Sequence, residues 1–206
     1  ELESRTAILE DNQFSTTTKL KGEVIFAFAD TFGDTVGDID SVSDAQTTFS
    51  DRVRLNFDTS FYGKDRLRTR LQACNFEALD EDVTGTASTR LGFDAGGDND
   101  IEVTDLHYRF PLNDKIRGWV GTAGLDLDDV FEVTNPMLER SGSGALSRFS
   151  RRNPLLFRGS EGAGAGVNLE LIEDKLGINA LYLADDNASD PSDGAGLFNG
   201  SFSAGG

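Results

Sequence analysis

Five arginines recur at alternate positions in two neighbouring segments, and their spacing indicates a binding surface. They are Arg52, Arg54, Arg66, Arg68 and Arg70. Alternate side chains of an extended strand share one face, so these arginines would form one wall, offset by Asp58 alone. Guanidinium groups around a narrow water passage attract anions and contact sugar hydroxyls. We expect Arg52, Arg54, Asp58, Arg66, Arg68 and Arg70 to line a pore, the alternative being a simply polar wall whose arginines are only solvated or paired.

Other groups with possible chemistry have weaker patterns. His107 and Cys74, the single histidine and the single cysteine, could pair as base and nucleophile, but no third group is predicted to orient them. Aspartates cluster in residues 30–40, 94–100 and 185–193, and none of these clusters has the calcium-binding spacing of an EF-hand. The sequence therefore predicts no catalytic residue, no metal site and no cofactor.

Composition limits the class of protein. The 206 residues fit one domain, and 19 Lys and Arg against 36 Asp and Glu give a net charge of -17. Such a charge disfavours a nucleic-acid partner, because a protein that binds nucleic acid must neutralise phosphates. The longest apolar run covers residues 24–29, whereas a membrane-spanning helix needs roughly 20 apolar residues. No spanning helix and no export signal is predicted, so a signal would lie upstream or be removed.

Apolar and polar residues alternate strictly in residues 49–61, and this period of two is typical of a strand with two different faces. Residues 66–76 repeat the pattern. We predict eight antiparallel strands around residues 20–28, 49–61, 66–76, 106–110, 116–120, 167–171, 176–180 and 197–206.

The registers of two hairpins can be predicted by requiring that the apolar faces of the paired strands lie on the same side of the sheet. A loop at residues 63–65 would pair Tyr62 with Arg66 and place Asp58 opposite Arg70 and Ser60 opposite Arg68. A loop at residues 172–175 would place three apolar residues of one strand opposite three of the next. These pairs are Val167 with Ala180, Leu169 with Ile178, and Leu171 with Leu176.

Connections between the predicted strands alternate between short and long. The short connections are residues 63–65, 111–114 and 172–175. The long connections are residues 30–47, 77–100, 124–161 and 185–195. Residues 86–93 have some strand character, and we assign them to the second long loop. This alternation predicts an all-β, antiparallel transmembrane β-barrel whose short turns face the periplasm. The amino terminus lies on the same side as the short turns and is therefore predicted to be periplasmic. Eight strands would enclose only side chains, whereas a channel needs roughly 16 to 18. The alternative is a soluble, carbohydrate-binding β-sandwich.

Several segments together resemble cyanobacterial outer-membrane porins, which are grouped with the OprB-type carbohydrate-selective porins. These segments are residues 14–22, 52–57, 64–71, 108–111 and 196–201. The resemblance implies that residues 1–13 end a periplasmic linker and that residues 14–206 are the first part of a 16- to 18-stranded barrel. It also implies an S-layer homology domain before the linker, which would bind the cell wall.

The long segment 124–161 is the candidate constriction loop, since the third loop of general porins folds into the channel. Its candidate residues are Asp126, Asp128, Asp129, Arg140, Arg148, Arg151, Arg152 and Arg158. An acidic loop face opposite the arginine wall would create a transverse field, although the loop could instead lie on the outer surface.

The resemblance implies an outer-membrane porin for passive diffusion of sugars, inorganic ions or iron. The expected partners are outer-membrane lipid, small hydrophilic solutes and two further copies in a homotrimer, with no nucleic acid. A structural protein that links the outer membrane to the cell wall is the alternative.

Overall fold

Eight strands form a single antiparallel sheet in chain order within the residues that the structure describes. The structure is a computed structural model, and it describes residues 17–32, 46–172 and 176–205. The strands are β1 (Thr18–Ala29), β2 (Thr48–Thr59), β3 (Arg66–Cys74), β4 (Glu102–Pro111), β5 (Ile116–Leu125), β6 (Gly162–Ile172), β7 (Leu176–Ala184) and β8 (Phe202–Gly205). Since the sheet order runs from β1 to β8 without closing, β1 and β8 are its edges. The predicted all-β, eight-stranded antiparallel fold is confirmed.

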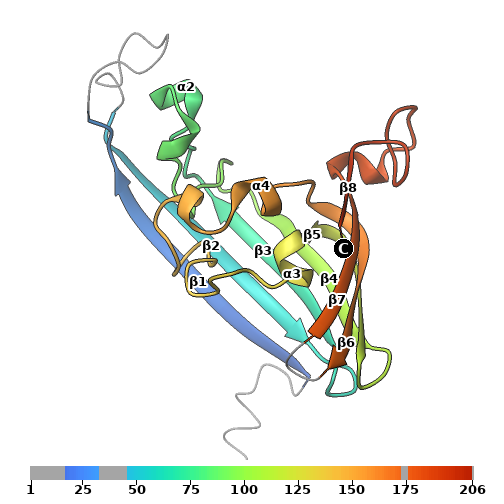
Figure 1. Ribbon diagram of the computed structural model, residues 1–206. Helices are drawn as coiled ribbons and strands as arrows, with labels where there is room; N and C mark the ends of the chain where they lie inside the picture. Colours follow the sequence, from blue (N-terminus) through green and yellow to red (C-terminus); the bar gives the residue numbers. More distant parts are fainter. Residues whose placement is uncertain (1–16, 33–45, 173–175, 206) are drawn as a thin grey trace, which may run out of the picture.

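The connections separate the two ends of the sheet. The short connections at residues 60–65 and 112–115 lie at one end, where β1 also begins (Figure 1). The connections from β3 to β4, β5 to β6 and β7 to β8 are long and lie at the opposite end. They contain the short helices α2 (Glu81–Thr84), α3 (Leu127–Val130) and α4 (Pro154–Phe157), and the 3-10 turns η2 (Ala87–Thr89), η3 (Arg148–Ser150) and η4 (Asp186–Ser189).

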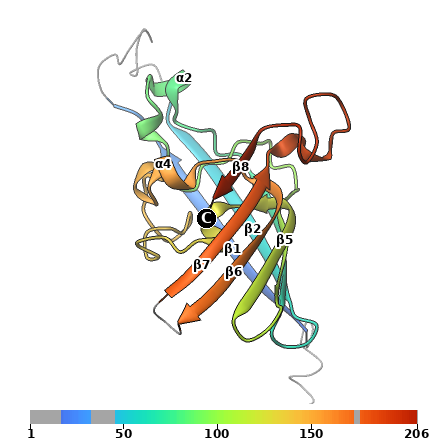
Figure 2. The same ribbon diagram turned by 45° about the vertical axis from the view of Figure 1, so that its right-hand side comes forward.

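The strands are long for a soluble sheet. Seven of them have 9 to 12 residues, which matches the 9 to 11 that a tilted strand needs to cross a bilayer. The sheet also curves strongly, so that β6 and β7 come forward of β1 and β2 (Figure 2). No helix in the described residues is long and apolar enough to cross a membrane.

The two faces of the sheet reverse the usual distribution of side chains in a soluble protein, because apolar side chains are exposed on one face and charged side chains are buried on the other. Phe28 and Phe49 stack on the convex face, where they are 77% and 60% exposed. On the other face, Arg52 and His107 are each only 1% exposed. Soluble proteins bury apolar side chains and seldom expose large contiguous apolar patches. The convex face is therefore suited to an apolar medium.

A small apolar core lies on the inner face of β5 and β7, where the long loop after β5 packs on the sheet. Trp119, Leu181 and Leu183 of the strands contact Val130 of α3, together with Leu125. Gly124 directs the chain into this loop with a φ of 58°, and a Cβ atom there would lie 2.0 Å from the carbonyl oxygen of Thr104. Only glycine fits this left-handed bend without strain.

The predicted register between β2 and β3 is wrong by two residues. Asp58 lies opposite Arg68, and Asn56 lies opposite Arg70. The reason is the Asp65 side chain, which accepts hydrogen bonds from the backbone N–H groups of Phe61 and Tyr62 and thereby extends the turn to residues 60–65. Because the shift is even, every side chain keeps its predicted face.

Three other strand predictions are settled by the structure. Val167 pairs with Ala180 as predicted, but a bulge near Glu170 makes Ile172, not Leu171, the partner of Leu176. The last strand is shorter than residues 197–206 and begins at Phe202. Residues 86–93 contain η2 and no named strand, in agreement with their assignment to a loop. The predicted linker, residues 1–13, lies outside the described residues.

Candidate pore wall and constriction loop

The predicted arginines lie on the inner face of β2 and β3, under the long loop between β5 and β6, which we call the third loop (residues 126–161). Arg54, Arg68 and Arg70 border a polar cavity of 1190 Å³ between this face and the loop. Arg52, Arg66 and Asp58 lie on the same face of the sheet but do not border the cavity. The alternation of β2 and β3 thus brings all six predicted residues to one wall.

Acidic side chains neutralise most of this wall. Arg52 Nη2 lies 2.7 Å from Glu23 of β1, and Arg70 Nη2 lies 3.4 Å from Asp105 of β4. Arg68 donates two hydrogen bonds to Asp58, at 2.8 and 3.2 Å. The prediction that Asp58 alone offsets the arginines is therefore wrong. Glu23 and Asp105 come from strands whose pairing with β2 and β3 depends on long loops, so sequence reasoning missed them.

Arg54 has different surroundings. Its guanidinium donates hydrogen bonds to Gln72 Oε1 of β3 and to Ser141 Oγ of the third loop, the latter at 2.5 Å. Among the described residues, no carboxylate lies within ion-pair distance of Arg54. Among the described residues, Arg54 is therefore the cavity-lining arginine of β2 and β3 without a direct ion pair, although Glu23 lies opposite it on β1, and it also joins the wall to the loop.

The third loop lies over the inner face of the sheet, as α3 and α4 do in Figure 1. Near β1 it comes so close that a Cβ atom on Gly142 would lie 2.2 Å from Glu23 Oε2. Near β6 the side chain of Asn168 donates a hydrogen bond of 2.8 Å to the carbonyl of Val130. The loop therefore crosses the concave side of the sheet and does not extend from its end.

Part of the charge of the third loop is compensated within the loop, and Arg148 lies 3.8 Å from Asp94 of the preceding long loop. Arg152 lies 2.8 Å from Asp126 and also pairs with Asp128. Arg158 donates to the carbonyl of Arg148, and Arg151 donates to that of Glu139. Arg140 is exposed and borders the cavity. Asp126, Asp128 and Asp129 border the same cavity as the arginines of the wall, with Asp126 and Asp128 also paired with Arg152 within the loop, so a transverse field between loop and wall stays a prediction.

Acidic and basic groups of the loop titrate away from their ordinary values. Burial raises the pKa of Asp129, more than the nearby His107 lowers it. Burial lowers the pKa of Arg158 to about 10, and the neighbouring Arg148 acts in the same direction. Burial also raises the pKa of Glu139. The loop therefore holds charged groups in places where water stabilises them less than in bulk.

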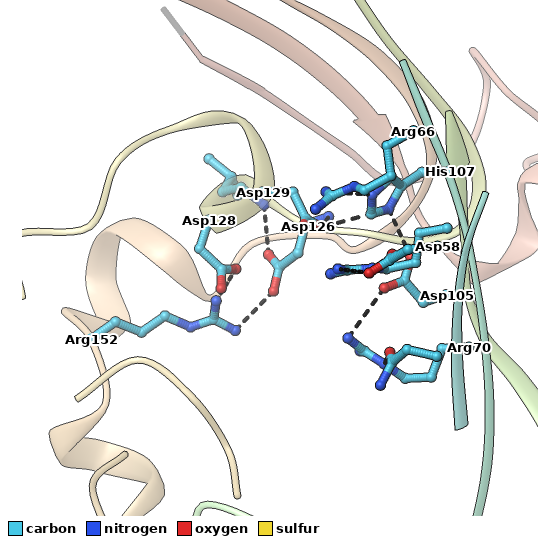
Figure 3. Close-up of polar contacts among 12 residues, drawn as sticks. Asp58, Arg66, Arg70, Asp105, His107, Asp126, Asp128, Asp129 and Arg152 are labelled. Carbon is cyan, nitrogen blue, oxygen red and sulfur yellow. Dashed lines mark hydrogen bonds and ion pairs between the residues drawn. The ribbon is translucent and has the colours of Figure 1, made fainter. Parts of the chain in front are cut away.

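A series of neighbouring polar side chains, which the sequence did not predict, extends from the third loop to the wall (Figure 3). His107 Nδ1 lies 2.7 Å from Asp105 Oδ1 and 4.0 Å from Asp129 Oδ2 of α3. Arg66 Nη2 lies 3.3 Å from His107 Nε2 on the other side of the ring. The expectation that no group orients His107 is therefore wrong. The i and i+2 spacing of Asp105 and His107 was the available signal, since it places both on one face of a strand.

The structure does not pair His107 with Cys74. His107 lies opposite Arg68, six residues along β3 from Cys74, which corresponds to about 20 Å at the rise of a strand. The buried Cys74 thiol accepts a hydrogen bond from the backbone N–H of Phe76. In the described part of the chain, no group of three or more His, Cys, Asp or Glu residues is arranged to hold a metal ion, and residues 33–40 lie outside that part.

Comparison with known proteins gives a family and two relatives. The profile of the family described as "Carbohydrate-selective porin, OprB family" matches residues 1–206. An uncharacterised protein of Synechocystis sp. is 44% identical over 202 residues, which are 98% of this chain and 36% of that protein. An uncharacterised protein of Nostoc sp. is 39% identical over 219 residues, covering 98% of this chain and 37% of that protein. No solved structure gives a significant match.

A curved antiparallel sheet with an apolar outer face, a charged inner face and alternating short and long connections defines the class of transmembrane β-barrel proteins. Within this class, the chain belongs to the OprB family of carbohydrate-selective porins. This family consists of channels and implies a location in the outer membrane. The chain spans just over a third of the length of the two relatives, at 36% and 37%.

Proposed function

We propose that the protein to which this chain belongs is an outer-membrane porin, through which sugars, inorganic ions or iron diffuse passively. The reversed faces of the sheet carry this proposal. Phe28 is 77% exposed on the outer face, while Arg54 and Arg70 border the polar cavity on the inner face, as a barrel wall between lipid and water requires. The β-sandwich alternative would bury the outer apolar face, which is exposed along β1 and β2.

The inner face of β2 and β3 is the proposed pore lining. Arg54, Arg68 and Arg70 border the cavity, and the guanidinium of Arg54 has no carboxylate partner among the described residues. An uncompensated cation in a narrow passage raises the local concentration of anions, and a guanidinium can contact several hydroxyls of a sugar. The third loop is the proposed constriction, because it covers this wall and leaves the cavity as the free space.

The surroundings of the protein are part of the same proposal. The exposed outer face would contact outer-membrane lipid. The amino terminus would be periplasmic, because β1 begins at the end of the short turns, which face the periplasm in such barrels. A domain before β1 would bind the cell wall, and three copies would form a homotrimer.

The test is the conductance of the full-length protein in a planar lipid bilayer. We expect discrete current steps and a reversal potential that indicates anion preference. The double variant Arg68→Glu, Arg70→Glu would reverse two charges of the wall and should lower the anion preference. The absence of steps from the parent protein would overturn the porin function. An unchanged reversal potential in the variant would overturn the arginine-lined passage.

A further inference from the structure

The long loop between β3 and β4, which we call the second loop (residues 75–101), pairs with the third loop through its backbone. Leu91 and Ser147 form an antiparallel β-bridge. Two backbone hydrogen bonds flank this bridge, from the N–H of Gly92 to the carbonyl of Leu146 at 2.6 Å and from the N–H of Arg148 to the carbonyl of Arg90 at 2.9 Å. Paired backbone groups fix the register of two segments, so the two loops form one unit.

A glycine allows the two loops to come this close. Gly92 is buried, and a Cβ atom there would lie 2.7 Å from the carbonyl oxygen of Ala145 and 3.4 Å from that of Leu146. A backbone carbonyl cannot turn aside as the end of a side chain can. Any larger residue at position 92 would therefore push the second loop away from the third loop.

One carboxylate lies beside this backbone pair. The side chain of Asp94 is fully buried and accepts hydrogen bonds of 3.0 and 3.1 Å from the guanidinium of Arg90. The guanidinium of Arg148 lies 3.8 Å from the same carboxylate. Removing the partner of a buried charge is strongly destabilising, because the charge that remains is poorly solvated. Asp94 therefore compensates an arginine from each of the two loops at the point where they pair.

The second loop is also attached to the wall. Arg52 of β2 is only 1% exposed, and its Nη1 atom donates a hydrogen bond of 3.2 Å to the carbonyl of Phe93. Its Nη2 atom lies 2.7 Å from Glu23 of β1. The phenyl ring of Phe93 packs edge-on against the buried Phe76, with ring centroids 5.2 Å apart. Arg52 thus connects the inner face of the sheet to the segment that pairs with the third loop.

The pairing determines where two arginines of the third loop lie. Arg148 and Arg151 both border the cavity, as does Asp94. The backbone of Arg148 is bonded to the second loop, and the Nη1 atom of Arg151 donates a hydrogen bond of 3.5 Å to the carbonyl of Gly92. The second loop therefore places both of these cations at the edge of the free space.

We propose that the second loop is a further element of the constriction, in which Gly92 and Asp94 are positioning residues that hold Arg148 and Arg151 at the cavity. This inference rests on the proposed function, since it assigns residues that set the geometry of that channel. Gly92 allows the backbone pair to form, and Asp94 compensates the arginines beside it. Loss of either one separates the loops without changing an arginine of the cavity lining.

The first test is a disulfide between the loops in the full-length protein. The double variant Leu91→Cys, Ser147→Cys should form it under mild oxidation, because antiparallel partners have Cα atoms about 4.5–5.5 Å apart, within the range of a disulfide. Mass spectrometry should find the tryptic peptides 91–109 and 141–148 linked until reduction. Leu91→Cys with Glu132→Cys is the control and should stay unlinked, since Glu132 borders a groove with Ile172 and Leu176 at the opposite end of the sheet. Equal linking of both pairs, or of neither, would overturn the pairing.

The second test is cleavage by trypsin after Arg90 and Arg148 in the full-length protein in detergent. Asp94→Asn should raise the cleavage rate about tenfold, because proteolysis follows the population of separated loops and a bond to a charged group is lost. Asp98→Asn makes the same change at an exposed carboxylate of the same loop and should match the parent. Equal rates for the two variants would overturn the role of Asp94.

The third test separates positioning from a simple effect of charge. Asp94→Asn and Gly92→Val should both raise the single-channel conductance, although only the first changes a charge. The oxidised disulfide between positions 91 and 147, introduced into the Asp94→Asn variant, should restore the conductance of the parent, and reduction should abolish the rescue. A conductance that the disulfide leaves unchanged would overturn the positioning role. A parent protein without any conductance would instead overturn the porin function, while the disulfide and cleavage results would still decide whether the loops pair.

Discussion

At the scale of single residues, Arg54 has surroundings unlike those of the other arginines that border the cavity from the strands. Arg68 and Arg70 each have a carboxylate partner, and Arg54 has Gln72 and Ser141. Neutral partners orient a guanidinium without cancelling its charge. The selectivity of the passage should therefore depend on Arg54 more than on the number of arginines in the wall.

We predict that Arg54→Gln lowers the anion preference of the channel more than Arg68→Gln does. The first change removes a charge without a direct ion pair, whereas the second leaves the Asp58 carboxylate next to Lys21, whose ammonium lies 3.4 Å away and still offsets it. Reversal potentials in a salt gradient measure both effects, and we expect the Arg54 variant to lose about half of the parent's anion-to-cation ratio or more. A larger effect of the Arg68 variant would contradict this ranking.

At the scale of elements, the turn between β2 and β3 depends on one carboxylate. Asp65 accepts hydrogen bonds from Ser60 Oγ, the backbone N–H groups of Phe61 and Tyr62, and the hydroxyl of Tyr108 on β4. Burial by itself would raise the pKa of Asp65, but these hydrogen bonds outweigh it and hold the pKa well below its usual range. The turn therefore joins three strands through the ionised form of one side chain.

We predict that Asp65→Asn lowers the thermal unfolding midpoint by about 4 °C at pH 7, because the amide offers fewer acceptor sites. The depressed pKa sets the pH dependence. The contribution of Asp65 is complete above its unfolded pKa of about 3.9 and is lost as the pH falls through the lower folded value. Unfolding in detergent, followed by circular dichroism, should show a constant difference from parent between pH 8 and pH 5. A difference that grows in acid would contradict the assignment.

The same turn shows where sequence reasoning succeeds and where it stops. Alternation in residues 49–61 is a local property, so it predicts the strands and the face of each arginine. The register depends on a side chain that captures backbone N–H groups, and alternation does not report this. Glu23, Asp105 and the surroundings of His107 escaped prediction for a related reason, since their neighbours come from strands separated by long loops and, at Asp105, by a bulge.

At the scale of the whole molecule, the outer face of the sheet determines the medium in which the protein folds. Val24 lies in the middle of β1 on this face, is 56% exposed and pairs with Val53. The neighbouring Phe26 is 70% exposed. A surface of this kind is stable against acyl chains and unstable in water.

We predict that Val24→Lys in the full-length protein costs about 2–4 kcal/mol of folding free energy in lipid vesicles, the expected penalty for a lysine facing the middle of the bilayer. Val24→Ala is the control for lost volume and should cost less. Urea titration of protein folded into vesicles measures both. A cost for the lysine variant no greater than that for alanine would mean that this position faces water.

The third loop also has a mechanical consequence. It touches β1 at Gly142 and packs on β5 and β7 through Val130, so it spans the curved sheet as a chord spans an arc. Flattening the arc would stretch the chord, and tightening the arc would slacken it. The loop thus acts as a cross-brace, and lateral pressure on the wall is transmitted to the element that narrows the passage.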